Sequence, residues 1–159
     1  MSNISDLLFE KKECAKVFLT ASNIGNKLNI PVYLVGGSVR DLLMGKRSYK
    51  DIDLMVEKDS GLFTEELAKA LKVKTIIPFE KFHTYKIPYK DIEIEVAAAR
   101  KETYNPESRK PNKVILTSIE DDLSRRDFRV NAIAVSLIEK NLGEIYDPLK
   151  GITDLQNKV

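Results

Sequence analysis

The sequence predicts an α+β domain in which helices and strands are mixed along one chain. The 159 residues suffice for a single domain, and a hydrophobic fraction of 43% is enough to fill a sizeable core. Segments with helical periodicity alternate with short apolar runs, yet strand-like runs near the middle of the chain follow one another directly. Regular β-α-β units would not place strands in this way, so the chain is not a run of such units.

Residues 1–30 predict an N-terminal helix. Ser5 and Asp6 can cap its start, Gly25 interrupts it near its end, and Asn29 with Pro31 closes it. Its later turns place apolar side chains on one stripe, namely Cys14, Val17, Phe18, Ala21 and Leu28. The stripe predicts burial, so we expect Cys14 to be a core thiol.

The remaining elements are short and follow from apolar runs and turn residues. Strands are expected at 32–35, 51–56, 73–77, 84–87, 91–98, 114–116 and 143–146. Helices are expected at 39–44, 63–71, 118–123 and 127–137, and another begins at 151–159. The segment 100–112 loses the pattern and is polar and marked by prolines, which predicts a mobile loop.

Composition narrows the class of protein. A net charge of +2, from 26 basic and 24 acidic residues, excludes a polycation that binds nucleic acid by charge alone. The single cysteine excludes an internal disulfide and suits a reducing compartment, and no long apolar run is present. The single histidine, His83, argues against a zinc site, and we interpret it as a structural side chain. A cytoplasmic domain with no membrane segment and no disulfide partner is expected.

Two carboxylates one residue apart mark the strand at 51–56. Because successive strand side chains alternate between faces, Asp51 and Asp53 project together while Ile52 and Leu54 point into the core. Like charges this close repel each other, and a divalent cation is the usual relief. Taken alone, the pair also fits a solvated sheet face without a metal.

A third carboxylate comes from the run 91–96, where three acids alternate with three apolar residues and therefore share one face. A two-metal site for phosphoryl transfer takes acidic ligands from neighbouring strands and holds its ions about 3.5–4 Å apart. Asp51, Asp53 and one acid of this run could supply such a site, and we select Glu95. The alternative is again that these acids cover a solvated face.

A glycine-rich turn, Gly36-Gly37-Ser38, leads from the strand at 32–35 into the next helix. Glycine lets the backbone approach phosphate oxygens, and the start of a helix offers N–H groups to an anion. Arg40 lies one turn later and can reach the same anion through a charge-assisted bond. The turn has neither the ending of a Walker loop nor a dinucleotide fingerprint, and a plain tight turn is the alternative.

The third cluster of charge spans residues 121–132 and contains three arginines within five positions. One or two of them could hold a triphosphate, while Asp127 could accept a hydrogen bond from a ribose hydroxyl. By itself the cluster fits a plainer interpretation, in which Asp127 caps a helix and the arginines pair with Asp121 and Asp122.

In this order, the motifs resemble the catalytic head domain of the class II tRNA nucleotidyltransferase and bacterial poly(A) polymerase family. That family carries a GGxVRD turn, a DxD strand, an acidic strand that runs on into E-V-x-x-x-R, a flexible loop and an RRDFxxNA segment. The matching segments here are 36–41, 51–53, 95–100 and 125–132, and the resemblance covers about residues 31–155.

The resemblance implies a polymerase-β-like nucleotidyltransferase fold, with a mixed central sheet flanked by helices. It also implies Mg²⁺-dependent transfer of nucleotides from CTP and ATP to the 3′ end of tRNA, either CCA addition or part of it. Carried over by position, Asp51, Asp53 and Glu95 would be the catalytic carboxylates and the magnesium ligands. The implied triphosphate-binding residues are Gly36, Gly37, Ser38, Arg40 and Arg126, and the implied ribose-binding residue is Asp127. A poly(A) polymerase head, or a non-catalytic nucleotide-binding module of the same fold, is the alternative.

The chain departs from the family pattern at two positions and in length. Arg129 stands where threonine is usual, and His83 replaces a glycine that commonly precedes Thr84. Family members continue into a helical neck, body and tail, so residues 1–159 are expected to be the head domain, with 151–159 the start of a truncated neck region. Affinity for tRNA would then need the absent parts, and the sequence does not distinguish CCA, CC, A or poly(A) addition.

Overall fold

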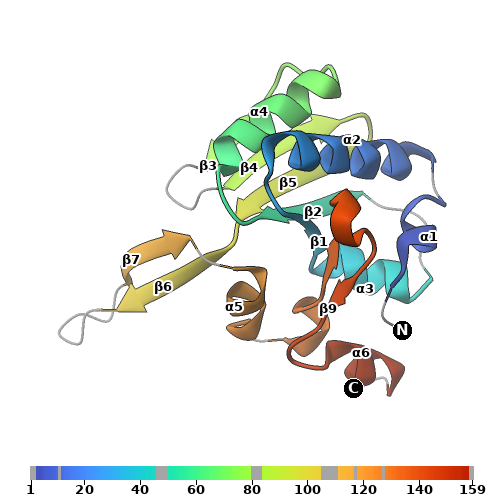
Figure 1. Ribbon diagram of the computed structural model, residues 1–159, viewed down its shortest axis with the longest axis vertical. Helices are drawn as coiled ribbons and strands as arrows, with labels where there is room; N and C mark the ends of the chain where they lie inside the picture. Colours follow the sequence, from blue (N-terminus) through green and yellow to red (C-terminus); the bar gives the residue numbers. More distant parts are fainter. Residues whose placement is uncertain are drawn as a thin grey trace.

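A seven-stranded mixed sheet forms the centre of the computed structural model, which describes residues 3–10, 12–45, 50–79, 84–104, 111–116, 118–126 and 128–157 (Figure 1). The strand order is β3-β4-β5-β2-β1-β8-β9. Strands β2 and β5 are parallel, and the other neighbouring pairs are antiparallel. The strands are β1 (Val32–Val35), β2 (Asp51–Val56), β3 (Ile77–Phe79), β4 (Thr84–Tyr89), β5 (Ile92–Ala98), β8 (Ala134–Ser136) and β9 (Ile145–Tyr146). This mixed architecture confirms the predicted fold class.

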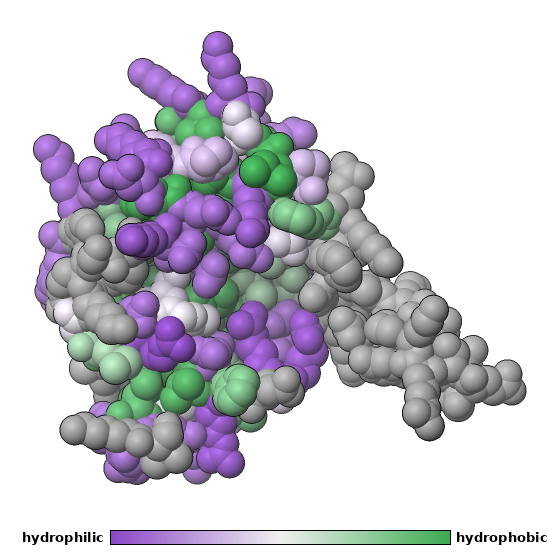
Figure 2. Space-filling model, turned by 180° about the vertical axis from the view of Figure 1, so that it is seen from behind, coloured by the Kyte–Doolittle hydropathy of each residue, from purple (hydrophilic) through white to green (hydrophobic). Residues whose placement is uncertain are grey.

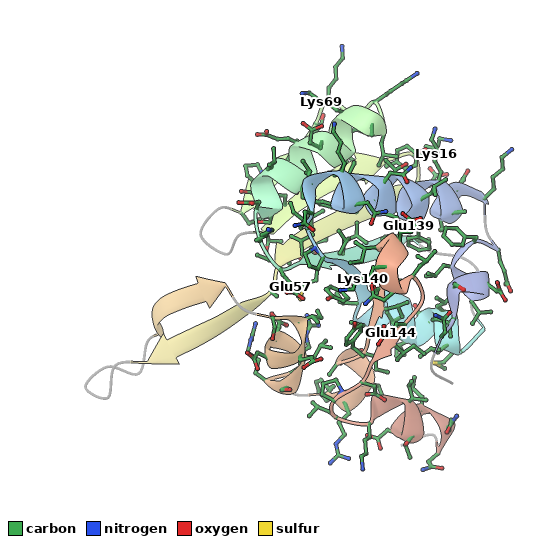
Figure 3. The ribbon with its side chains drawn as sticks, viewed as in Figure 1. Lys16, Glu57, Lys69, Glu139, Lys140 and Glu144 are labelled. Carbon is green, nitrogen blue, oxygen red and sulfur yellow. The ribbon has the colours of Figure 1, made fainter. Side chains whose placement is uncertain are left out.

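Helices α2 and α4 lie side by side over one face of the sheet (Figure 1). The α-helices are α1 (Ser5–Leu8), α2 (Lys12–Leu28), α3 (Gly37–Leu43), α4 (Ser60–Ala70), α5 (Ile119–Ser124) and α6 (Gly151–Gln156). Within the described residues, two short 3₁₀ helices are η2 (Arg129–Asn131) and η3 (Glu139–Asn141). Lys16 on α2 and Lys69 on α4 extend away from the sheet (Figure 3), while Phe18 and Phe63 on the same helices are buried. Each helix is therefore amphipathic and packs its apolar side on the sheet.

The alternation of side chains along β2 and β5 divides the sheet into an apolar and a functional face. Ile52, Leu54, Ile94 and Val96 belong to the main core, which includes the buried side chains of α2 and α4. The opposite face is covered at one end by a smaller apolar cluster, which includes Leu123 of α5 and residues of β1 and β8. The acids of β2 and β5 project on this second face, beside the cluster.

The N-terminal helix predicted for residues 1–30 is wrong as a single element, because the chain forms α1 and α2 separately. Helix α1 is fixed by the C-terminal half of the sheet, where the Ile4 N–H donates to the Gly143 carbonyl at 2.9 Å. Gly25 does not interrupt α2, which continues to Leu28. A Cβ at Gly25 would come within 2.7 Å of Val32, so this glycine permits a close approach of helix and strand. Cys14 is a buried core thiol, as predicted.

Two other predictions failed where short apolar or polar runs were ambiguous. The predicted helix at 127–137 is instead η2 followed by β8, because the buried run 132–137 supplies a strand that pairs with β1. The strand expected at 73–77 begins only at Ile77, and its Pro78 is tolerated because β3 is an edge strand.

The polar segment expected to be a loop contains a two-stranded hairpin. Strands β6 (Arg100–Tyr104) and β7 (Pro111–Leu116) pair with each other away from the main sheet (Figure 1). Hydrogen bonds between two backbones need no apolar side chains, so the polar composition of this segment did not predict the pairing of β6 with β7. His83 and the centre of this segment, residues 105–110, lie outside the described residues.

Helix α6 packs against η2, and this contact requires glycine. The Gly151 N–H donates to Asp147 Oδ1 at 2.6 Å, and a Cβ at position 151 would overlap the Arg129 carbonyl. We expect Gly151→Ala to lower the free energy of unfolding by about 2–3 kcal/mol, because backbone must move to admit the methyl group. Urea denaturation measures this loss, and Thr153→Ala on the exposed side of α6 is the control. Equal stability of the two variants would contradict the packing described here.

The surface seen from behind is mostly hydrophilic, with apolar side chains in small groups (Figure 2). The large exposed apolar side chains are scattered over the described part of the chain, namely Phe9, Leu19, Met44, Leu62, Ile77, Phe79 and Phe128. Among the described helices, none combines the length and apolar character needed to cross a membrane.

Candidate active site

Three carboxylates lie on one face of the sheet where β2 and β5 run side by side. The parallel register places Asp51 opposite Glu93 and Asp53 opposite Glu95, so these acids share one face of the sheet. Asp51 is exposed, whereas Asp53 and Glu95 are half-buried. The structure therefore brings together Asp51, Asp53 and Glu95, which were selected from the sequence.

Asp53 lies at the electrostatic centre of this group. Burial raises the pKa of Asp53 from 3.8 to about 6, and the negative charges of Glu95 and Asp51 act in the same direction. The charges of Arg126 and Lys86 oppose the shift. Lys86 on β4 is itself paired with Glu93, with Nζ 3.0 Å from Oε1. The carboxylates thus repel one another more strongly than nearby cations can offset.

This donor set suits a divalent cation. Carboxylate oxygens are the ligands that Mg²⁺ prefers, and a cation would relieve the repulsion that adds to burial in raising the pKa of Asp53. Among the described residues, no three acidic, histidine or cysteine side chains yet converge closely enough to enclose an ion. Binding would need the carboxylates to rotate, which the open position of Asp51 allows.

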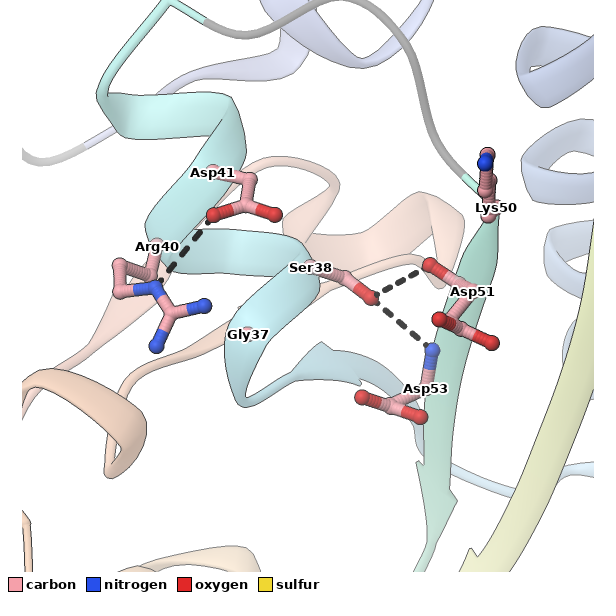
Figure 4. Close-up of a pocket in the computed structure, with 7 residues that line it drawn as sticks. All are labelled: Gly37, Ser38, Arg40, Asp41, Lys50, Asp51 and Asp53. Atoms are coloured by element: carbon pink, nitrogen blue, oxygen red, sulfur yellow. Dashed lines mark hydrogen bonds and ion pairs between the residues drawn. The ribbon is translucent and has the colours of Figure 1, made fainter.

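The glycine turn lies against these acids and joins β1 to α3 (Figure 4). Gly36 adopts φ 66° and ψ −138°, a conformation that is essentially restricted to glycine. The Ser38 hydroxyl donates to the Asp51 carbonyl at 3.2 Å and accepts from the Asp53 N–H at 3.1 Å. The side chain of Ser38 therefore fixes the start of α3 to β2. The contact of Ser38 with a triphosphate stays a prediction. Because the hydroxyl already bonds to β2, the backbone N–H of Ser38 would have to make this contact.

Arg40 and Arg126 reach the glycine turn from two directions. The Arg40 guanidinium folds back over the turn, so that Nη2 would lie 3.3 Å from a Cβ built on Gly37. Arg126 Nη1 and Asp53 Oδ2 would lie 3.9 Å and 3.7 Å from a Cβ built on Gly36. The structure thus gathers both arginines predicted from the sequence at the turn, close to the carboxylates.

Two cavities meet at Asp53. The larger, of about 340 Å³, lies between the glycine turn and β2 and is lined by Gly37, Arg40 and Asp53, among others (Figure 4). The smaller, of about 220 Å³, is lined by Asp53, Glu95, Arg126 and apolar residues of the sheet. The larger cavity has a size typical of small-ligand sites, and both charged pairs of neighbours, Arg40 with Asp41 on α3 and Lys50 with Asp51 at β2, line it.

A protein-family model described as the poly(A) polymerase head domain matches residues 32–159. The chain belongs to the poly(A) polymerase head-domain family. This confirms the family predicted from the motifs, and the fold is the polymerase-β-like nucleotidyltransferase fold.

Curated relatives of this chain are A-adding tRNA nucleotidyltransferases and CCA-adding enzymes. An A-adding tRNA nucleotidyltransferase from Aquifex aeolicus is 39% identical over 80% of this chain and 15% of its own length. A CCA-adding enzyme from Streptococcus pyogenes is 33% identical over 79% of this chain and 29% of its own length. The chain therefore spans less than a third of the length of these relatives.

Solved structures show the same architecture. An apo form of a CCA-adding enzyme matches with a TM-score of 0.85 and 35% identity, over 98% of this chain and 37% of the other. A CCA-adding enzyme in complex with ATP matches with a TM-score of 0.80 and 32% identity, over 97% of this chain and 35% of the other. The Thermotoga maritima CCA-adding enzyme in complex with tRNA matches with a TM-score of 0.77 and 32% identity, over 97% of this chain and 34% of the other.

Of the two residues that hold the arginines of the head domain, Asp122 was considered from the sequence and Asn131 was missed. The buried Asp122 carboxylate accepts from Arg126 Nε at 3.2 Å and from Arg125 Nη2 at 3.4 Å, which is the plainer pairing considered from the sequence. Pairing with Asp122 does not remove Arg126 from the site, because its other nitrogen faces the glycine turn. From the sequence, Asn131 was noted only as part of the RRDFxxNA motif and was given no role of its own. Asp127 lies outside the described residues, so its ribose contact stays a prediction.

Proposed function

We propose that this chain is the catalytic head of a tRNA nucleotidyltransferase, which transfers AMP or CMP from ATP or CTP to the 3′ end of tRNA. One observation carries the proposal: Asp53 lies between Glu95 on the parallel neighbouring strand and a glycine turn flanked by two arginines. Nucleotidyl transfer needs carboxylates that can hold metal ions and cations that can bind the phosphate chain, and this cavity is lined by both kinds of group. Two comparisons support tRNA as the acceptor: a relative is named an A-adding tRNA nucleotidyltransferase, and a similar solved structure is a CCA-adding enzyme in complex with tRNA.

In the proposed reaction, the 3′-hydroxyl of the acceptor releases its proton to solvent and its oxygen bonds to the α-phosphorus, while the bond from the α-phosphorus to the bridging oxygen breaks and pyrophosphate leaves. Asp51, Asp53 and Glu95 would hold magnesium, which lowers the pKa of the attacking hydroxyl and stabilises negative charge at the phosphate. Arg40 and Arg126 would bind the β- and γ-phosphates and offset the charge that develops on pyrophosphate. Gly36 and Gly37 leave room for the phosphates to approach the backbone.

The pKa of Asp53 bears on this role. A carboxyl with a pKa of about 6 is mostly ionised at neutral pH but becomes protonated in mild acid, and neighbouring cations favour its ionised form. Arg126 already acts in that direction. The proposed tRNA substrate and the presence of a single cysteine in the sequence support a cytoplasmic location for the protein.

A second candidate is poly(A) synthesis, which the description of the matching family model favours. The two activities differ in the length and acceptor of the product. A tRNA nucleotidyltransferase stops after completing the tRNA end, whereas a poly(A) polymerase extends unrelated RNA by many adenylates.

The test incubates the chain with α-labelled ATP or CTP and with tRNA that lacks one or all of its terminal CCA residues. We expect magnesium-dependent labelling of tRNA, and no labelling when EDTA removes the metal. The nucleotide incorporated on each tRNA end distinguishes A addition from CCA addition, and long products on unrelated RNA indicate poly(A) synthesis. Nucleotide binding without transfer to any RNA would contradict the proposal and favour a non-catalytic module.

A further inference from the structure

We propose that Asn131 is a positioning residue that holds Arg40 and Arg126 together as one triphosphate-binding unit, an inference that rests on the proposed function. The Asn131 side-chain oxygen accepts from Arg40 Nη1 at 3.1 Å. The main-chain oxygen of the same residue accepts from Arg126 Nη1 at 3.3 Å. One residue therefore contacts both arginines, although Arg40 lies 91 positions earlier in the chain.

Each guanidinium is held on one side by protein acceptors and faces the glycine turn on another. For Arg40, Nε pairs with Asp41 at 3.3 Å and Nη1 with Asn131, while Nη2 lies over Gly37. For Arg126, Nε pairs with the buried Asp122. Fixing a planar guanidinium in this way lowers the rotamer entropy that it loses when it binds phosphate.

The chemistry of asparagine suits this task. Arginine has no acceptor atom, so the partner of Arg40 must be the amide oxygen of Asn131. The amide is neutral and leaves the positive charge of Arg40 available to an anion. A second carboxylate beside Asp41 would instead offset that charge and repel the phosphates.

The position of Asn131 is set by buried neighbours. It ends η2, where its N–H donates to the Phe128 carbonyl at 3.0 Å, and the next residue, Ala132, is fully buried. Helix α6 supports η2 from the other side through the close contact of Gly151 with Arg129. The side chain of Asn131 is thus presented to Arg40 from a supported segment.

The test compares the binding of ATP, AMP and inorganic tripolyphosphate to the chain by calorimetry in the presence of magnesium. We expect Asn131→Ala to weaken ATP and tripolyphosphate binding by about tenfold and AMP binding by less than about twofold. Asn131→Asp keeps the acceptor, yet it should also weaken ATP binding because it adds negative charge. Adding Asn131→Ala to Arg40→Ala should cause little further loss, since both remove the same interaction.

Asn141→Ala is the matched control, because Asn141 also lies on a 3₁₀ helix and bonds two side chains, Ser136 and Tyr146. It should leave the ratio of ATP to AMP affinity unchanged. Equal loss of ATP and AMP affinity in Asn131→Ala, or no loss, would overturn the inference. If the wild-type chain does not bind ATP more tightly than AMP, the proposed function is contradicted. Thermal unfolding of the variants then tests the contact between Asn131 and Arg40 without any nucleotide. Non-additive shifts in Tm for Asn131→Ala and Arg40→Ala support the contact, and additive shifts refute it.

Discussion

Asp53→Asn is expected to abolish nucleotide addition and, at the same time, to make the folded chain more stable near neutral pH. The asparagine removes a carboxylate oxygen from the centre of the site, where Asp53 faces Glu95 across the parallel strand pair. We expect activity on tRNA to fall at least about 1,000-fold. Single-turnover incorporation of labelled nucleotide measures this loss, and Asp91→Asn, which changes an exposed acid in the turn before β5, is the control.

The gain in stability follows from the raised pKa of Asp53. Between about pH 4 and pH 6 the folded chain binds a proton at Asp53 that the unfolded chain has lost. The contribution of Asp53 to stability is therefore present below about pH 4 and is lost as the pH rises through 6. Without metal, Asp53→Asn should raise the free energy of unfolding by about 1–2 kcal/mol near neutral pH and have little effect at about pH 4. A lower stability of the variant at neutral pH would contradict the electrostatic description of the site.

Gly36→Ala is expected to damage both the fold and the site. Its backbone conformation, φ 66° and ψ −138°, costs an L-residue about 1–3 kcal/mol. The added methyl group would lie 3.7 Å from Asp53 Oδ2 and 3.9 Å from Arg126 Nη1, between the two sides of the proposed phosphate site. We expect nucleotide addition to fall by about 100-fold, as measured with saturating tRNA.

Gly45→Ala is the control that distinguishes the effect of backbone strain on stability from the effect of Gly36→Ala on nucleotide addition. Gly45 also has a positive φ, 82°, but no described atom lies within 4 Å of an added Cβ. The control should lose a similar amount of stability and retain full activity. Full activity in Gly36→Ala would show that the glycine turn does not contact the nucleotide.

The fold was predictable where one local pattern had one interpretation. Strand β2 matches its predicted bounds because Ile52 and Leu54 alternate with acids, which only a half-buried strand explains. The run 132–137 is apolar at almost every position, and such a run fits a helix or a strand equally well. The run forms a strand because β1 offers an edge with which it can pair, and the local sequence of the run does not contain that information.

The site was predictable to the same degree. Asp51, Asp53, Glu95 and Arg40 were found because each belongs to a short motif whose chemistry is local. The role of Asn131 was not, since it depends on contact with an arginine 91 residues away. Lys86 was missed for a similar reason: its approach to the carboxylates follows from the register of β4 on β5, not from its sequence neighbours.

The central claim is that the carboxylates of β2 and β5 and the arginines at the glycine turn bind a nucleoside triphosphate together with magnesium. Calorimetric titration of ATP into the wild-type chain and Asp53→Asn, each with magnesium and with EDTA, tests it most directly. We expect the wild-type chain to bind ATP tightly only with magnesium, and Asp53→Asn to lose most of this metal dependence. Binding of ATP to the wild-type chain with equal affinity in magnesium and EDTA would contradict it.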